Sequence, residues 1–216
     1  MLWATTCLVV GFLGAQVARG QGTVIFNNRI TGTGGLTTHV WSSSSTNPGM
    51  AWVGLGSNDS PSGTTPFGSA SATSMIGYGG SGGHYGYKTT FAQLLAAPGA
   101  DQPESNLVPA GQTTTFRSGA SVGGVAGIVA TLGNVPKDAP VATVQMVAWD
   151  NSSGLYPTWT EAYTAWWNGF ISAGKSVPFN VYNIGGDTNP AAALVGVQSF
   201  NLLYPGIPRP QRVDEL

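Results

Sequence analysis

The segment ATVQMVAW at residues 142–149 decides the fold class, because a strand built from it is apolar on both faces. Val144 would lie on one face, and Val147 and Trp149 on the other. The segment VAGIVATL at residues 125–132 has the same two-sided character. Strands of this kind are typical of the covered centre of a fold. We therefore predict that these two segments are central strands that form the core.

Alternating side chains and turn signals extend the β pattern along the chain. Residues 87–95 alternate as a pleated strand requires, and Pro98-Gly99 ends the alternation. Clusters of turn-forming residues separate further strands, which we predict at residues 23–27, 113–117, 178–182 and 194–203. The spacing predicts an all-β domain, an antiparallel β-sandwich of the jelly-roll or immunoglobulin-like kind.

Residues 31–86 have a different composition, dominated by Gly, Ser, Thr and Asn. We predict long loops there, carrying short strands at residues 37–41 and 50–55. The Gly-rich segment 77–86 lacks the Lys-Ser/Thr pair and the following helix of a phosphate-binding loop. It is therefore predicted to be a flexible surface loop.

One segment favours a helix over a strand. Thr158 and Glu161 have the spacing of a capping box, in which each side chain accepts a hydrogen bond from a backbone amide of the first helical turn. Aromatic residues then follow at helical spacing, which predicts one short helix near residues 158–173, crossing one end of the sandwich. Packing against the sheet explains this aromatic stripe best. A sugar-stacking platform is the alternative, with three candidate residues: Trp159, Trp166 and Trp167.

The N-terminal residues 1–20 have the pattern of an export signal. A short apolar run is followed by small residues at Ala18 and Gly20, which predicts cleavage before Gln21. The mature chain would be one domain over residues 21–204 with a Pro-containing flexible tail at 205–216. We expect a secreted protein, extracellular or periplasmic, without a membrane span after signal removal.

Composition excludes several classes of partner. Only 8% of the residues are charged and the formal net charge is −1, so the chain lacks the basic surface that nucleic acid or an anionic membrane requires. Its one cysteine, Cys7, lies in the predicted signal, so the mature chain would be cysteine-free and would contain no disulfide. Its stability must come from burial.

The assembled residues resemble a group of exported bacterial proteins, the PEP-CTERM sorting-domain proteins of unknown function. The matching pieces are QGTV with FNN at residues 21–28, FAQL with PG at 91–99, TFRSG at 115–119, VQMVAWD at 144–150 and LVGVQSF at 194–200. The resemblance implies an exported β-sandwich linked to the cell envelope or to an extracellular polysaccharide matrix. It implies no established enzyme activity and supplies no catalytic residues. Residues 204–216 lack the Pro-Glu-Pro motif, apolar helix and basic tail of that group, so no sorting helix is predicted.

Few residues offer catalytic or metal-binding chemistry. Asp150 is explained by a turn in which its side chain accepts a backbone amide, and Glu161 by the capping box. Asp187 and Asn189, joined by Asp150 if the two loops meet, are candidate ligands of a hard cation, although a structural turn fits their small number better. His84 has no nearby ligand partner in the sequence. No cofactor is expected.

A second set of residues bears on nucleophilic catalysis. A Gly-x-Ser-x-Gly turn between a strand and a helix would indicate a Ser-His-Asp triad, and the sequence has no such turn in that setting. Gly80-Ser81-Gly82 does not have that setting.

These observations favour a secreted structural or interaction protein of the cell envelope or exopolysaccharide matrix, without catalysis. The alternative is a carbohydrate-binding module or glycan-active enzyme that uses exposed Trp residues. Exposure of the Trp rings separates the two: coplanar rings in an open groove would favour sugar binding, and burial would favour a structural role. Extracellular polysaccharide or envelope components are the expected partners.

Overall fold

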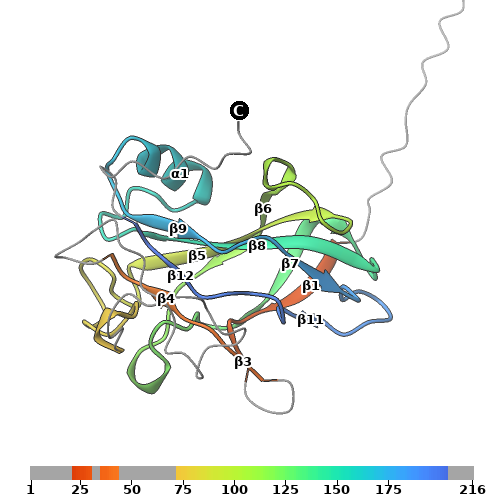
Figure 1. Cartoon of the computed structure of the whole chain (residues 1–216), viewed down its shortest axis with the longest axis horizontal. Helices are drawn as coiled ribbons and strands as arrows, with labels where there is room; N and C mark the ends of the chain where they lie inside the picture. Colours follow the sequence, from red (N-terminus) through yellow and green to blue (C-terminus); the bar gives the residue numbers. More distant parts are fainter. Residues whose placement is uncertain (1–20, 31–34, 44–71, 204–216) are drawn as a thin grey trace, which may run out of the picture.

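The computed structural model describes residues 21–30, 35–43 and 72–203, which form a mostly β fold with one α-helix, α1 (Trp159–Trp167) (Figure 1). The predicted signal at 1–20, the strand at 50–55 with Trp52, and the tail at 205–216 lie outside the described residues. Three short 3-10 helices complete the helical elements of the described ranges: η2 (Ala72–Ser74), η3 (Glu104–Asn106) and η4 (Gly119–Ser121).

The largest sheet has five strands and is antiparallel. Its order is β10 (Phe179–Tyr182), β8 (Val141–Asp150), β5 (Thr90–Pro98) and β6 (Val108–Thr114). The fifth strand, β9 (Ala173–Lys175), pairs with the C-terminal part of β8. Every residue of β8 after Val141 is buried. The prediction of a central strand covered on both faces is confirmed for this segment.

Three smaller sheets surround it. One has the order β11 (Ala192–Ala193), β1 (Gln21–Phe26) and β7 (Ile128–Pro136); the others pair β12 (Phe200–Asn201) with β4 (Val40–Trp41), and β2 (Arg29–Ile30) with β3 (Leu36–Thr37). The β1–β11 and β4–β12 pairs are parallel, so the prediction of a purely antiparallel fold is wrong there. Their chain segments are far apart in sequence, which gives the long connection that parallel pairing needs.

Two apolar cores lie on the two faces of β8. On one face, Val144 and Met146 pack with residues of the three-stranded sheet such as Phe26. On the other face, Val147 and Trp149 pack with the buried side of α1. The central strand β8 is therefore covered on both faces, as its two-sided sequence requires.

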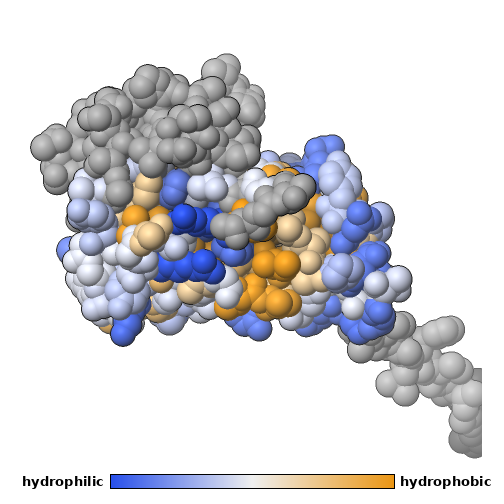
Figure 2. Space-filling model, turned by 90° about the horizontal axis from the view of Figure 1, so that it is seen from below, coloured by the Kyte–Doolittle hydropathy of each residue, from blue (hydrophilic) through white to orange (hydrophobic). Residues whose placement is uncertain are grey.

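Strand β7 differs from the prediction, because only one of its faces is covered. Val129 is 59% exposed and Ile25, its register partner on β1, is 38% exposed. Ala193 of β11 lies in register with Ile25 on the other side, so the outer face of this sheet carries a short apolar row. Figure 2 views the molecule from below and shows apolar side chains gathered beside strongly polar ones. An outer strand face in a small sheet is not buried merely because its residues are apolar.

Several predicted boundaries also move. The strand expected at 87–95 begins only at Thr90, because residues 87–89 form turns. Of the strand expected at 113–117, only the first two residues belong to β6, and Phe116 forms an isolated bridge with Val125. The segment 194–203 is strand only at β12, since Val197 donates its backbone N–H to Leu194 in a local turn. Strand β9 was not predicted.

Helix α1 begins as predicted and ends earlier. The capping box is present: Thr158 accepts from the amide of Glu161 at 3.4 Å, and the Glu161 carboxylate accepts from the amide of Thr158 at 3.1 Å. The helix ends at Trp167, short of the predicted residue 173, and Gly169 follows with φ of 87°, a conformation that ends helices.

A fully buried amide, Asn28, joins the N-terminal strands to the body of the fold. Its Nδ2 donates to the carbonyls of Thr38 and Gly123, and its Oδ1 accepts from the amide of Val125 at 2.8 Å. The bonds to Gly123 and Val125 span 95 and 97 residues of sequence. Asn28 therefore has a structural role.

Candidate functional site

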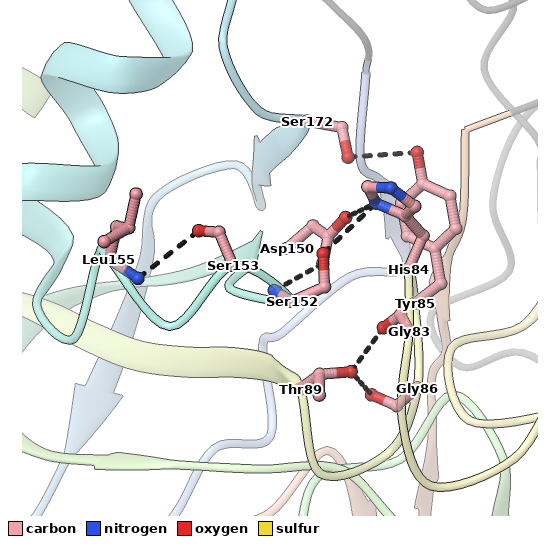
Figure 3. A network of polar contacts seen from close by, with 10 residues as sticks. All are labelled: Gly83, His84, Tyr85, Gly86, Thr89, Asp150, Ser152, Ser153, Leu155 and Ser172. Atoms are coloured by element: carbon pink, nitrogen blue, oxygen red, sulfur yellow. Dashed lines mark hydrogen bonds and ion pairs between the residues drawn. The ribbon is translucent and has the colours of Figure 1, made fainter.

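The most chemically distinctive contact in the described residues joins His84 and Asp150 (Figure 3). Asp150 ends β8, and its side chain is only 4% exposed. Its Oδ2 lies 2.5 Å from Nδ1 of His84, whereas the His84 side chain is 77% exposed. Oδ1 accepts from the amide of Ser152 at 3.0 Å, as the turn prediction required. A buried carboxylate therefore fixes an exposed imidazole.

The Gly-rich segment 77–86 presents His84 through a set of backbone hydrogen bonds. Gly77 donates to the carbonyl of Tyr85 at 2.9 Å, and Tyr87 donates to the carbonyl of Gly80 at 3.0 Å. Gly86 permits a close turn, because a Cβ there would lie 2.6 Å from the carbonyl oxygen of Gly82. The segment lies at the surface as predicted, and it has a defined hydrogen-bonded shape.

Tyr85, next to His84, has a backbone conformation that aromatic residues rarely adopt. Its φ is 59°, in the left-handed region. Its hydroxyl accepts from Ser172 Oγ at 3.0 Å. The surrounding contacts hold a strained residue beside the imidazole, an arrangement that is common at functional sites.

The loop after β8 is fixed just as firmly. Asn151 donates its amide to Thr89 at 2.8 Å, and its side chain accepts from the amide of Tyr156 at 2.8 Å. The indole N–H of Trp149 donates to the carbonyl of Tyr156 at 2.7 Å. Both segments that carry the His84–Asp150 contact are therefore anchored to the sheet.

A small pocket of about 110 Å³ opens beside this contact. Its polar walls come from His84, Asp150 and serine hydroxyls, and its apolar walls from Phe170, Ile171 and Tyr156. The serines are Ser152, Ser153 and Ser172. The pocket is a mixed polar and aromatic site at the surface.

The geometry of the contact does not activate a serine. Ser152 Oγ lies 3.2 Å from Nδ1 of His84, the same ring nitrogen that contacts Asp150. In a hydrolase triad the carboxylate contacts one ring nitrogen and the serine the other, so that the imidazole can accept the serine proton. Here the serine and the carboxylate share one nitrogen. The cluster favours binding by an oriented imidazole.

Of the three candidate tryptophans of α1, two are buried and one is exposed. Trp159 and Trp166 are 5% and 4% exposed and pack on Trp149, whereas Trp167 is 61% exposed. The Tyr163 and Trp167 rings meet at 84°, nearly perpendicular. The structure therefore forms no coplanar platform from the three candidate residues.

Exposed apolar side chains nevertheless surround α1. We call this set the α1 surface: Leu155 before the helix, Tyr163 and Trp167 on it, and Phe170 after it. Leu155, Trp167 and Phe170 are each more than 60% exposed, at 70%, 61% and 69%. Phe170 also lines the pocket of His84, so the apolar and polar features adjoin.

The candidate cation ligands are not brought together. Asp187 Oδ1 lies 2.6 Å from Nζ of Lys137, a residue that precedes the start of β8. Asp150 is the last residue of that strand. A strand of ten residues separates them by about 30 Å. The backbone N–H of Asn189 donates to Asp138 Oδ1 at 2.7 Å, and its side-chain amide donates to the carbonyl of Ile184 at 3.3 Å. Within the described ranges, no three His, Cys, Asp or Glu residues form a metal-binding group.

The pKa values of Asp138 and Lys137 are shifted where these residues contact residues 187–189. The pKa of Asp138 is lowered because its carboxylate accepts backbone N–H bonds, from Asn189 first and then from Asp187 and Thr188. The pKa of Lys137 is raised by its hydrogen bond and charge attraction to Asp187. The loop is thus a charged, amide-bound turn that closes one end of β8.

Comparison with protein-family models, curated proteins and solved structures finds no match to the chain. The resemblance to PEP-CTERM sorting-domain proteins therefore stays a prediction. In the part of the chain that the structure describes, no helix has the length and apolarity to cross a membrane.

Sequence reasoning missed the His84–Asp150 contact because 66 residues separate the two partners. His84 lies in a segment without periodicity, and Asp150 was already explained by its turn. The sequence held one signal of the contact: His84 is the only ionisable nitrogen side chain in the segment 77–86, which otherwise consists of Gly, Tyr and Ser.

Proposed function

We propose that the protein is a secreted, non-catalytic interaction protein of the cell envelope or exopolysaccharide matrix, and that its α1 surface contacts neutral polysaccharide. One observation carries the proposal. Large apolar side chains stay exposed on α1 and its flanks, directly beside a pocket of hydroxyl and imidazole groups. A helix that served only to cover the sheet would be expected to expose polar residues there.

The chemistry of the α1 surface favours a neutral sugar polymer as its partner. Sugar rings present apolar C–H faces to aromatic side chains and hydroxyls to polar groups, and both kinds of group adjoin at Phe170. Charged groups near the surface are already engaged: Glu161 caps the helix and Asp150 holds His84. The low charge of the whole chain agrees with a partner that is recognised without ion pairs.

Binding is favoured over glycan cleavage. Glycoside hydrolysis by the common route uses two carboxyl groups that face each other across the substrate. Among the described residues that line the pocket of His84, Asp150 is the sole acidic one, and both of its oxygens are engaged with Ser152 and His84. We therefore place the protein with carbohydrate-binding proteins and not with glycan-active enzymes.

Architecture and location belong to the same proposal. The shared core between the five-stranded and three-stranded sheets supports a β-sandwich. Export through residues 1–20 would bring this domain to the compartment where polysaccharide matrix occurs.

The test is retention on neutral polysaccharides. The mature chain would be run through native gels containing dextran, xylan or galactomannan, and incubated with insoluble cellulose and chitin. We expect retention by at least one of them, lost in the double variant Trp167→Ala/Phe170→Ala. The matched control is Tyr182→Ala, since Tyr182 is 62% exposed but pairs with Val141 at the opposite end of β8.

Three outcomes would contradict the proposal. The wild-type chain could pass all of these polymers without retention. The Tyr182→Ala variant could lose retention as strongly as the double variant. Size-exclusion chromatography could show a dimer that Trp167→Ala dissociates, which would make the α1 surface a contact between copies of the chain.

A further inference from the structure

The pocket of His84 is too small to enclose a complete ligand. Its volume is about 110 Å³, whereas sites for small molecules commonly measure about 300–1,000 Å³. A ligand that uses it must therefore place one edge in the pocket and leave the rest outside. A single unit of a polymer lying across the surface satisfies this condition.

The imidazole of His84 is oriented to meet such an edge. Its polar contacts with the described residues run through Nδ1, toward Asp150 and Ser152. Nε2 therefore remains the ring nitrogen that can meet a ligand, on a side chain that is 77% exposed. A ligand hydroxyl can donate to Nε2 or accept from it, so it fits either protonation state of the ring.

The remaining walls exclude charged ligands. The described residues that line the pocket include no Lys or Arg, so a phosphate, sulfate or carboxylate would meet no positive charge from them and would lie near the carboxylate of Asp150. A cation would find that carboxylate already engaged by Ser152 and His84. Serine hydroxyls supply the other polar contacts. The polar groups therefore match uncharged hydroxyls.

Aromatic rings supply the apolar side of the same pocket. Phe170 is 69% exposed and Tyr156 is partly buried, and both are lining residues. A sugar unit could place its C–H face against a ring and its hydroxyl edge against His84 and the serines. The aromatic walls match the C–H face of a sugar ring, and the serine hydroxyls and imidazole match its hydroxyl edge.

We infer that this pocket is a subsite for one unit of a neutral, hydroxyl-rich sugar, with Asp150 acting as the positioning residue for the His84 imidazole. The class of ligand rests on the proposed function. Phe170 belongs to both the pocket and the α1 surface, whereas Trp167 does not line the pocket, so the two can fail separately.

The two histidines of the chain make the site directly observable by NMR. The full mature chain would be titrated with soluble neutral oligosaccharides, namely malto-, cello-, xylo- and manno-oligosaccharides. We expect saturable shifts of the His84 ring signals with at least one of them. His39, which is 6% exposed, is the internal reference and should not respond. Oligogalacturonate, an acidic probe, should leave both rings unchanged.

Variants then assign the contacts. His84→Ala and Phe170→Ala should each weaken binding of the responding oligosaccharide about tenfold, the effect of losing one ligand contact of roughly 1.4 kcal/mol. Asp150→Asn should also weaken binding while the His84 signals of the free protein move, because the ring loses its charged partner. Tyr182→Ala should bind as the wild type does.

The outcomes separate the inference from the proposed function. A His84 ring that responds to no neutral oligosaccharide, or that responds equally to oligogalacturonate, would overturn the inference. Retention on polysaccharide that is lost in Trp167→Ala but kept in His84→Ala would overturn it too, and would leave the proposed function standing. His84 shifts without retention on any polymer would support the subsite and contradict the proposed function.

Discussion

Asp150 and His84 form a contact in which a carboxylate 4% exposed lies 2.5 Å from the Nδ1 atom of an imidazole 77% exposed. The carboxylate belongs to the central strand of the largest sheet, and the imidazole to a Gly-rich surface loop. The contact therefore ties an exposed loop side chain to the end of a buried strand. A second link between residues 77–86 and the buried part of the fold is the hydrogen bond from Ser172 to the Tyr85 hydroxyl.

Removing this carboxylate should destabilise the protein. In Asp150→Ala the amide of Ser152 and Nδ1 of His84 both lose their acceptor, and because water can reach the exposed His84 ring, each lost hydrogen bond should cost the net value of about 0.5–1.5 kcal/mol. Asp150→Asn should cost less, since an amide oxygen can still accept from Ser152. Urea unfolding followed by Trp fluorescence measures both. If Asp150→Ala were as stable as the surface control Asp187→Asn, the contact would have no structural weight.

Local patterns in the sequence were sufficient for the central strand and for the start of the helix. Residues 142–149 are apolar on both faces, and burial on both faces is the arrangement that leaves none of them in water. Thr158 and Glu161 satisfy each other's backbone amides without help from distant residues. Predictions of this kind succeed because the physical cause lies within a few residues.

Other features depend on partners that the sequence does not specify. Val129 is apolar but exposed, because β7 lies at the edge of a three-stranded sheet whose outer face is uncovered. The strand at 194–203 shrinks to β12, which pairs with β4, and beyond it Leu203 forms only an isolated bridge with Ala173. The pocket of His84 joins residues from three separated segments. Long-range pairing decides each of these cases.

The helix cap should contribute measurably to stability. Thr158→Ala removes the side-chain acceptor for the amide of Glu161, a change that typically costs about 0.5–2 kcal/mol. Glu161→Gln is the matched control, because glutamine retains the acceptor oxygen of a capping box. Hydrogen exchange of the amides in Trp159–Trp167 should accelerate in Thr158→Ala and change little in Glu161→Gln. Equal acceleration in both variants would contradict this account of the cap.

Alanine substitutions of the two neighbouring tryptophans Trp166 and Trp167 should have very different effects on stability. Trp166→Ala would empty a site that is 4% exposed in the second core, with an expected loss of about 3–5 kcal/mol in the free energy of unfolding. Trp167→Ala removes a ring that is 61% exposed, and should change stability by no more than about 0.5 kcal/mol. Urea unfolding would compare the two. A large loss in Trp167→Ala would show that the α1 surface is structural, and would count against a binding role.

The loop held by Asp138 should give a pH-dependent contribution to stability. Backbone amides, that of Asn189 first, lower the pKa of this carboxylate in the folded state. Its contribution is therefore fully present above the unfolded pKa of about 3.9, and is lost as the pH falls through the lower folded value. Asp138→Asn should thus be less stable than the wild type at neutral pH, and the difference should close in acid.

The substitution isolates the charge, because the backbone at Asp138 has φ of 53° and asparagine tolerates that region as well as aspartate does. Urea unfolding midpoints of both proteins, measured across the acidic range, check the prediction. Thr188→Ala is the control: Thr188 contacts Asp138 only through its backbone amide, so the variant should keep the wild-type pH dependence. A stability difference between Asp138→Asn and the wild type that stayed constant down to the most acidic pH would mean that ionisation of this carboxylate does not hold the loop.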